Sequence, residues 1–431
     1  MVSKKAKHNS IETQHSTQVV AGVLKMTCHR SFREVEFLRE RWDELVESVG
    51  GDLFSSFDWC AIWWKYFGQG RRLHLYIATV GDELVAVLPL FRETIHWGPL
   101  SLRVVRMVGS DYLVTRSNVV IVPQWLEQVT ITLMTSLDGD GSWDLFQIGN
   151  LPDYLQQSQA FAEALRRCKQ AGRVVFNDNA YPNMFFDLAD TFEKYLEKLS
   201  RKERRNVRRD GRKLEQRALV MCRRIVDKSQ LHVAFSELIN MHQQHWLEHG
   251  RLGHFGEWPN AEQFHRELAE VLLDRDRLVF VEVLANGQLQ AAEYGGRFGQ
   301  RVHWITGCRR REATSRIGFC ALVRVAMQIG ATQIDALSGY YGYKRRLGAK
   351  VMGVKTIVVF PPRWTSRLYA QLFKAVTWLI ELIYFRIWFW RLAPWLRRKL
   401  PKLQLSLLYA GRWQRLIRVS FLLKRKQREP E

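Results

Sequence analysis

Apolar and polar residues alternate along this chain in a unit that occurs twice. The first copy, LHLYIATVGDELVAVLPL, spans residues 73–90, and the second, RLVFVEVLANGQLQAAEYGG, spans residues 277–296. Each copy is an apolar run, a turn of residues that accept φ > 0, and a second run, which is the pattern of a β-hairpin. The second copy continues through a strand, a helix over residues 317–330 and a short strand from Gln333. The first copy continues in the same order to WDLFQIGN.

This repetition predicts two similar α/β halves and not a solenoid, because two long copies are too few for stacking repeats. We expect an α/β (α+β) fold class with two domains, each a mixed sheet flanked by helices. The expected segments are a disordered N-terminus at 1–23, an N-terminal half at 24–190, a C-terminal half at 191–361 and an amphipathic helical tail at 362–431.

The composition favours an anionic partner. The chain has 431 residues and 65 Lys and Arg against 43 Asp and Glu, a net charge of +22, and such an excess attracts phosphates, nucleic acid or acidic membranes. Its six cysteines are scattered without a C-x-x-C pair. That spacing argues against a zinc site or a disulfide framework and fits a reducing cytoplasm. We therefore expect a cytoplasmic protein without a metal.

The tail holds much of the positive charge. Residues 363–431 contain 16 Lys and Arg but 3 Asp and Glu. No run reaches the roughly 18 uncharged residues of a spanning helix. Abundant Trp and Arg along an amphipathic stretch predict a helix lying on an anionic membrane surface, at the inner face of the cell membrane. The alternative is a helical hairpin that packs on the body or mediates self-association.

A second basic segment, residues 192–218, reads as one long helix with charge nearly all round. It is either a solvated surface helix or a contact for an anionic acceptor, a membrane or tRNA. No stacking aromatics accompany it, so we expect no specific nucleic-acid recognition.

The strand, polar loop and helix over residues 301–330 form a candidate anion site. The first-turn amides and the helix dipole both attract phosphate. Arg311 and Arg316 add positive charge around them. Thr314 and Ser315 can cap the helix, and Gly318 allows close backbone approach. The alternative is an ordinary capped turn with solvated arginines.

From about residue 195 to 352 the chain resembles the CelD-like acetyltransferases of the GNAT superfamily. The matching motifs, in order, are KLSRKERRNVRRDGRKLEQ, F-x-E-L-x-x-x-H-x-x-x-W, NGQLQAAEYGGRFGQRVHWITGC, SRIGFCALVRVAMQIGATQIDALSG and YGYKRRLGAK. The last motif also resembles Fem-type peptidyltransferases, which carry paired GNAT-like domains. The internal duplication agrees with that two-domain plan.

The resemblance implies an acyl-coenzyme A, with acetyl-coenzyme A the expected donor. In this family the loop and helix start bind the pyrophosphate. The corresponding residues here are Arg311, Thr314, Ser315, Arg316, Ile317 and Gly318. The usual loop reads Q/R-x-x-G-x-G/A, whereas Ala313 and Arg316 occupy two of these positions here. The glycine-rich approach is therefore partly lost.

The resemblance also places Lys344 at the active site, where an ammonium would stabilise a developing charge. Tyr343 could then protonate a departing thiolate. The alternative is that Lys344 belongs to a solvated basic turn. For the general base we consider His303 and Glu293, on strands expected to face the cleft, and Asp335 on the next strand. A strand histidine can equally be a core residue, and a water chain can replace the base.

His242 and His245 lie three residues apart on a predicted helix, near Trp246. A metal is possible at that spacing. However, no further carboxylate or cysteine completes the set, which favours a wall of the substrate cleft.

The sequence as a whole predicts an acyl-coenzyme A-dependent N- or O-acyltransferase. The acceptor would be a saccharide or another cell-envelope-related molecule at the cytoplasmic membrane face, attacked directly without a covalent enzyme intermediate. Two alternatives remain. One is a Fem-type transferase that uses aminoacyl-tRNA, and the other is a non-catalytic GNAT-derived scaffold at the membrane, to which the altered phosphate loop would point.

Overall fold

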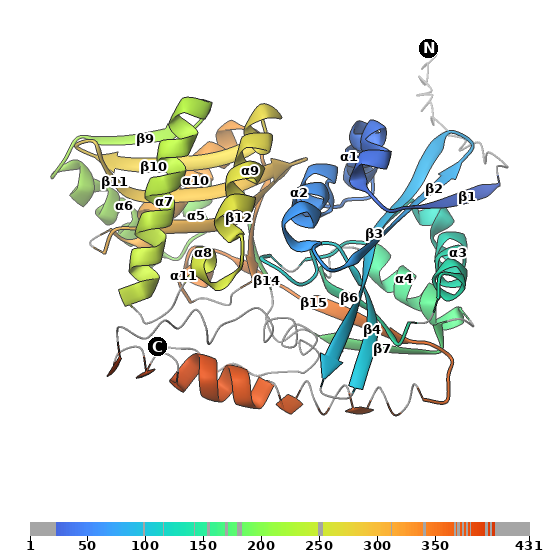
Figure 1. The fold of residues 1–431 in the computed structure, drawn as a ribbon. Helices are drawn as coiled ribbons and strands as arrows, with labels where there is room; N and C mark the ends of the chain where they lie inside the picture. The colour runs from blue at the N-terminus through green and yellow to red at the C-terminus, as the bar shows by residue number, and fades with distance from the viewer. Residues whose placement is uncertain are drawn as a thin grey trace, which may run out of the picture.

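A computed structural model describes most of the chain (Figure 1). The described residues are 23–365, except 98–99, 115, 142, 153–155, 169–170, 179–182, 249–252, 312 and 339–341, together with part of residues 368–400. Residues 1–22, on which the expectation of a disordered N-terminus rests, lie outside the described part.

Two mixed sheets organise the described residues. The strands of the first, in spatial order, are β1 (Leu24–His29), β2 (Arg72–Val80), β3 (Glu83–Trp97), β4 (Leu100–Met107), β6 (Leu145–Pro152), β15 (Val354–Phe360) and β7 (Arg173–Asp178), with β5 (Val120–Ile121) also paired to β3. The strands of the second are β9 (Val220–Arg224), β10 (Leu278–Ala285), β11 (Gln288–Phe298), β12 (Arg301–Arg309), β13 (Gln333–Ser338), β8 (Asn183–Asp187) and β14 (Lys350–Met352). The expected α/β class with two similar halves is confirmed.

The two hairpins of the repeat match residue by residue. In the first, Val80 pairs with Glu83, and in the second Ala285 pairs with Gln288. Both hairpins also have a register shift near the turn, where Val85 and Gln290, each in the second strand, have no partner across the hairpin. A bulge at the same place in both copies sets the same twist, so the two sheets are equivalent locally as well as in strand order.

The halves exchange strands. β8 precedes residue 190 in the chain but pairs with β13 and β14 of the second sheet, whereas β15 follows the second sheet in the chain but lies between β6 and β7 of the first. The sequence-based division into 24–190 and 191–361 is therefore wrong for these two strands. Each exchanged strand is bonded on both sides, so the halves cannot separate without breaking sheet hydrogen bonds.

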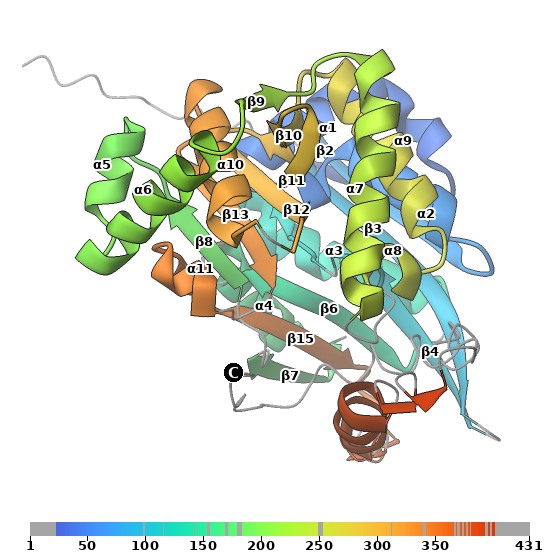
Figure 2. The same cartoon turned by 90° about the vertical axis from the view of Figure 1, so that its left-hand side faces the viewer.

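Helices cover both faces of each sheet (Figure 2). On the first sheet, α1 (Arg39–Ser48) and α2 (Phe57–Phe67) face α3 (Leu126–Gly139) and α4 (Gln156–Arg167). On the second sheet, α5 (Phe192–Glu197), α6 (Arg201–Glu215) and α10 (Ser315–Gln328) lie opposite α7 (Lys228–Glu248), α8 (His254–Glu257) and α9 (Ala261–Asp274). The remaining helices are η1 (Phe32–Leu38), η2 (Leu53–Ser55), η3 (Pro123–Trp125), α11 (Gly342–Arg346) and η5 (Glu381–Leu392).

The basic segment at 192–218 is two helices and not the single helix expected. Ser200 separates them because its side chain accepts a hydrogen bond from the backbone N–H of Glu203 and so starts α6. Glu203, Val207 and Asp210 form the buried stripe of α6, and its basic residues other than Arg204 are exposed.

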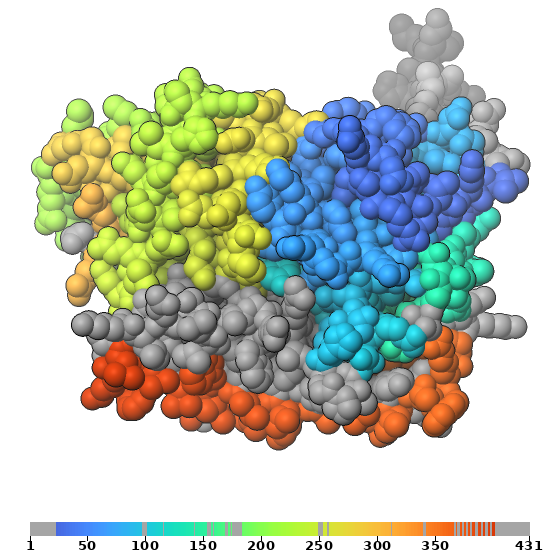
Figure 3. All heavy atoms as spheres, viewed as in Figure 1, coloured from blue at the N-terminus to red at the C-terminus, as the bar shows by residue number. Residues whose placement is uncertain are grey.

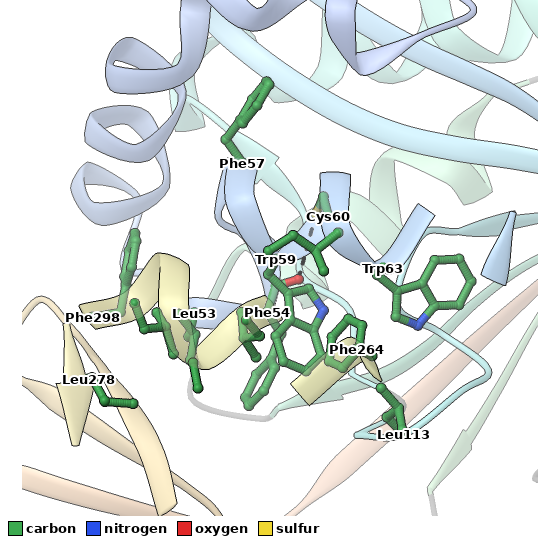
Figure 4. Close-up of a cluster of buried hydrophobic side chains, with 14 of the residues drawn as sticks. Leu53, Phe54, Phe57, Trp59, Cys60, Trp63, Leu113, Phe264, Leu278 and Phe298 are labelled. Atoms are coloured by element: carbon green, nitrogen blue, oxygen red, sulfur yellow. Dashed lines mark hydrogen bonds between the residues drawn. The ribbon is translucent and has the colours of Figure 1, made fainter. Parts of the chain in front are cut away.

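One aromatic core joins the halves (Figure 4). Trp59 on α2 packs edge-on against Phe264 on α9, with ring centroids 5.1 Å apart. Phe54 packs against the imidazole of His303 at 5.1 Å. Because these buried contacts connect residues of both halves, the two sheets share one hydrophobic cluster, and each sheet has a further cluster on its other face.

The described residues of the tail lie along one edge of the molecule, beside both halves (Figure 3). Among the described residues, no helix has both the length and the apolar content needed to cross a membrane.

Candidate active site

The site lies where two parallel strands of the second sheet separate. β12 and β13 pair over three positions, from Arg301 with Gln333 to His303 with Asp335, and then diverge. A cavity of about 640 Å³ occupies the gap. Its walls come from β12, β13, α7, α8 and α11, and also from Leu113 and Val114 of the N-terminal half. Separated strands leave backbone N–H and C=O groups without a sheet partner, which suits an extended amide-containing ligand.

Glu293 of β11 projects into this cavity between two glycines. Its partner across the sheet is Gly307, and Gly318 of α10 faces it from the helix. A Cβ atom at either glycine would lie less than 3.0 Å from a carboxylate oxygen of Glu293. The two glycines therefore provide the space that this carboxyl group occupies.

Trp304 of β12 contacts the same carboxyl group. The register between β11 and β12 shifts so that Tyr294 pairs with Thr306 and Gly295 with Trp304, which leaves Ile305 unpaired. The Trp304 indole Nε1–H donates a hydrogen bond of 2.8 Å to Glu293 Oε2. Trp304 and Ile305 both line the cavity, whereas His303 lies before the shift, where β12 is still paired with β13.

Lys344 of α11 enters the cavity from the opposite side. Its Nζ donates a 2.8 Å hydrogen bond to the carbonyl of Ala336, at the start of the diverging part of β13. The ammonium also lies 5.5 Å from the centre of the Trp304 ring. Trp304 thus contacts both Glu293 and Lys344.

Burial brings the pKa values of Glu293 and Lys344 close to each other. It raises the pKa of Glu293 to about 8, against the opposing effects of the Trp304 hydrogen bond, Arg309 and Lys344. It lowers the pKa of Lys344 to about 8, against the attraction of Asp335 and Glu293. Two titratable groups in one cavity whose pKa values lie close to neutral pH are suited to proton transfer.

His303 and Asp335 lie behind the cavity and do not line it. Both are buried at the junction of the halves, where Arg116 of the N-terminal half contacts Asp335 at 2.5 Å and Asp52 at 2.9 Å. Burial lowers the pKa of His303 to about 3. Burial alone would raise the pKa of Asp335, but Arg116 holds it below its ordinary value. The expectation that His303 faces the cleft is wrong, and this pair is part of the interface between the halves.

The six residues expected at the phosphates divide into different environments. Ser315 lines the cavity. Thr314 is the N-cap of α10, yet its side chain makes no capping hydrogen bond, and its Oγ1 is buried without a hydrogen-bond partner among the described residues. The start of α10 therefore offers unsatisfied polar groups. Ile317 is partly buried in the core beneath the helix.

Arg316 and Gly318 contact protein groups and not the space expected for the pyrophosphate. The Arg316 guanidinium pairs with Glu203 at 2.5 Å and Asp210 at 3.0 Å, and so fastens α10 to α6. Gly318 makes room for Glu293, as described above. Arg311 is exposed next to the loop.

Tyr343 of α11 lines the cavity, as do His242, His245 and Trp246 of α7. The backbone N–H of His254 donates to His242 Nε2 at 3.2 Å, so Nδ1 carries the proton that is donated to the Gly307 carbonyl at 3.2 Å. Burial lowers the pKa of His242 to about 4. This imidazole is held neutral with both nitrogens engaged, in agreement with a cavity wall.

Sequence reasoning missed Trp304 and the contribution of the N-terminal half at Leu113 and Val114. Alternation along β12 places the indole on the face opposite His303, and no local pattern shows that this face borders the cavity. The N-terminal residues lie far from the site in the chain, and no local signal connects them with it.

Comparison with known proteins identifies one matching domain family. A family model described as an acetyltransferase (GNAT) domain matches residues 201–345. The search of curated proteins gave no match. Among solved structures, the chain is similar to FemX with a TM-score of 0.55 and 12% identity, covering 81% of this chain and 99% of FemX.

Two further solved structures are similar to this chain with lower TM-scores. A tandem GNAT protein from the clavulanic acid biosynthesis pathway has a TM-score of 0.40 and 11% identity, covering 79% of this chain and 100% of that one. The C-terminal domain of a putative lysylphosphatidylglycerol synthetase from Agrobacterium fabrum has a TM-score of 0.41 and 9% identity, covering 66% and 84%. Only the FemX likeness supports a conclusion, and at its low identity that conclusion is the two-sheet fold alone. Residues 201–345 thus match the model of a GNAT acetyltransferase domain, which supports an acyltransferase.

Proposed function

We propose that the protein transfers an acyl group from acyl-coenzyme A, with acetyl-coenzyme A the expected donor, to an amine or hydroxyl acceptor in the cavity between β12 and β13. The observation that carries the proposal is the facing pair of Glu293 and Lys344 in this cavity, inside the segment that matches the family model. Both have pKa values of about 8, within reach of physiological pH.

The residues around the start of α10 fit the phosphates of coenzyme A. The Thr314 hydroxyl is buried without a hydrogen-bond partner among the described residues, and the helix start has no side-chain cap. Ser315 connects this end of the helix with the cavity. Amides at a helix N-terminus attract phosphate, and the Thr314 side chain does not cap those of α10. Bound acyl-coenzyme A would supply the thioester that is attacked.

The remaining roles belong to the cavity side chains. Ionised Glu293 would accept the proton of the attacking amine or hydroxyl. The Lys344 ammonium would stabilise negative charge that develops on the attacked carbonyl oxygen. Tyr343 would give a proton to the departing thiolate and be reprotonated from solvent. Trp304 holds the Glu293 carboxylate in place through its indole N–H.

The proposed acceptor is a saccharide or other envelope-related molecule at the inner membrane face, and the tail supports that location. Trp364, Trp378 and Trp395 have exposed fractions of 87%, 56% and 53%. Aromatic side chains of this kind are enriched at membrane interfaces, and the many Lys and Arg residues of the tail would add attraction to anionic lipids. A cytoplasmic enzyme held at the membrane in this way would meet acceptors presented there.

Binding of acetyl-coenzyme A tests the donor. Thermal unfolding of the full chain should shift upwards with acetyl-coenzyme A, as linkage requires, and turnover should fall by about 10²-fold or more in Lys344→Met. Lys350→Met is the matched control, because Lys350 is exposed and pairs with Asp187 outside the cavity. Absence of stabilisation by acetyl-coenzyme A, or unchanged turnover in Lys344→Met, would contradict the proposal.

Membrane association is tested separately. The full chain should cosediment with anionic vesicles at low salt, and replacing Trp364, Trp378 and Trp395 together by Ser should weaken this binding. Phe37→Ser, an exposed aromatic change in the N-terminal half, is the control. Equal binding by the parent and the triple variant would indicate that the tail packs on a protein partner instead.

A second candidate donor is aminoacyl-tRNA, as in the Fem-type enzymes that the sequence resembles. The observation in its favour is the exposed face of α6, where Arg201, Lys202, Arg205, Arg212 and Lys213 are exposed. A polyanion would bind such a face with strong salt dependence. Stabilisation by aminoacylated tRNA but not by acetyl-coenzyme A would replace the first proposal with this one.

A further inference from the structure

Three potential metal ligands converge on the first sheet, in the half of the molecule opposite the acyl-transfer cavity. They are Cys28 on β1, His74 on β2 and Asp140 at the C-terminal cap of α3. One ligand atom from each lies within 4.8 Å of the other two. Among the described residues this is the one group of three His, Cys, Asp or Glu side chains close enough to share an ion.

The sheet explains why residues so distant in the chain meet. Cys28 pairs directly with Tyr76 in the antiparallel register of β1 and β2. His74 is two residues from Tyr76, so it lies on the same face as Cys28 at the diagonal position. Asp140 reaches this face from α3, with its carboxylate 3.1 Å from His74 Nδ1. The scattered cysteines argued against zinc only because their spacing in the chain could not reveal this arrangement.

The three side chains have protonation states that a metal could use. Burial, helped by Arg92 and Arg30, lowers the pKa of His74 to about 4, so its imidazole is neutral at pH 7. Burial opposes ionisation of Asp140, but Tyr76 and His74 hold its pKa below the ordinary value. Burial raises the pKa of Cys28, so this thiol would have to lose a proton on metal binding.

We propose that Cys28, His74 and Asp140 bind Zn²⁺. Thiolate, imidazole and carboxylate together suit this ion better than Ca²⁺ or Mg²⁺, which prefer oxygen ligands. Bonds of about 2.0–2.3 Å place the ligands of tetrahedral zinc roughly 3.3–3.8 Å apart. The carboxylate of Asp140 already lies 3.1 Å from His74 Nδ1, and a pair at the widest separation, 4.8 Å, would need to shorten by about 1.0–1.5 Å. His74 and Asp140 also line an open cavity of about 920 Å³, which leaves room for water as the fourth ligand.

Two arginines oppose the ion and limit its affinity. Arg30 lies 3.6 Å from Asp140, but its side chain is 53% exposed and can turn to solvent. Arg92 is held by the carbonyls of Leu137 and Asp140, at 2.9 Å and 3.1 Å, and stays nearby. Tyr76, which donates to the Asp140 carboxylate at 3.1 Å, would orient that ligand from behind.

The bound ion would tie β1 and β2 to the end of α3. Since only β1 and β2 are joined by sheet hydrogen bonds, the link to α3 is the new constraint. This site is independent of the acyl-transfer proposal, because none of its residues lines the cavity between β12 and β13.

The test uses the metal-free full chain titrated with Zn²⁺ by calorimetry and with Co²⁺ by absorption. One equivalent should bind, Co²⁺ should give a sulfur-to-cobalt charge-transfer band, and Zn²⁺ should raise the melting temperature. Cys28→Ser should remove the band and weaken Zn²⁺ binding at least tenfold. Cys222→Ser, which changes the other exposed cysteine, should leave both unchanged.

Asp140→Asn provides a second variant and should also weaken Zn²⁺ binding at least tenfold, with circular dichroism to show that it remains folded. The absence of stoichiometric binding would overturn the proposal. Binding with equal affinity in parent, Cys28→Ser and Asp140→Asn would overturn it too, because the ion would then be held elsewhere.

Discussion

The two halves of this protein use the same sheet for different purposes. Counted from the matched hairpin turns, Leu88 in the first half corresponds to Glu293 in the second. Leu88 is 2% exposed and packs in the core, whereas Glu293 is 6% exposed and carries a carboxyl group into a cavity. One half therefore completes its hydrophobic interior at the position where the other places an ionisable group.

The halves also differ in how the next strand continues. In the second half the chain passes from Trp304 to Arg309 along β12 with one bulged residue. At the equivalent place in the first half, between the partners of Leu90 and Ala86, the chain leaves the sheet after Met107 and returns at Ile121. The excursion carries Leu113 and Val114 to the cavity of the second half, and Arg116 to Asp335. The segment of the first half that corresponds to the cavity-lining part of β12 thus forms a wall of the cavity in the second half.

Breaking the connection between the halves should have the largest effect. Arg116→Met would leave the buried carboxylates of Asp52 and Asp335 without their shared cation, and we expect a loss of about 3–5 kcal/mol in the free energy of unfolding. Urea unfolding measures the change. Arg208→Met, which breaks an exposed pair with Glu193, should cost less than about 1 kcal/mol. Similar losses in both variants would show that the Arg116 contact does not join the halves energetically.

Making the second half resemble the first should abolish activity and spare the fold. In Glu293→Leu, turnover should fall by about 10²-fold or more, which corresponds to about 2.7 kcal/mol in the activation barrier. Thiol release from acetyl-coenzyme A, with the acceptor present, measures it. Leu88→Met keeps the volume of the corresponding core position and should leave turnover unchanged. Retained activity in Glu293→Leu would remove Glu293 from the mechanism.

The glycines beside Glu293 provide a finer test. The added methyl group in Gly318→Ala would overlap the Glu293 carboxylate, and we expect a loss of about 1–3 kcal/mol in stability together with lower turnover. Gly211→Ala is the control, because Gly211 lies inside α6 with nothing near its Cβ position, and alanine there should stabilise by about 0.5–1 kcal/mol. If Gly318→Ala behaved like Gly211→Ala, the proposed seat for Glu293 would be wrong.

The smallest effect is the dependence of turnover on pH. The ionised fraction of Glu293 rises with pH through about 8, while the charged fraction of Lys344 falls through about 8. Activity that needs both charges should peak near pH 8 and fall by up to about tenfold per unit on either side. Residual turnover of Glu293→Gln should lose the decline on the acid side. A flat profile in the parent would contradict these roles.

Much of this arrangement could be predicted from the chain because it depends on local pattern. The matched apolar runs and turns predict both hairpins, and the order of elements after them predicts two similar halves. Glu293, Tyr343, Lys344 and Ser315 were all expected near a reaction site, and the structure brings them to one cavity. Their catalytic and binding roles remain predictions.

The sequence by itself therefore determined the duplicated fold, the acyltransferase class and four residues of the cavity, since each is encoded by residues that are neighbours in the chain or by a motif. Only the tertiary structure decided which side chains share a space. His303 lies where β12 is still paired with β13 and is therefore part of the interface, Glu203 and Asp210 hold Arg316 away from the cavity, and β8 and β15 each pair in the sheet of the other half. These outcomes depend on register and on packing between distant segments, and alternation along one strand carries no information about either.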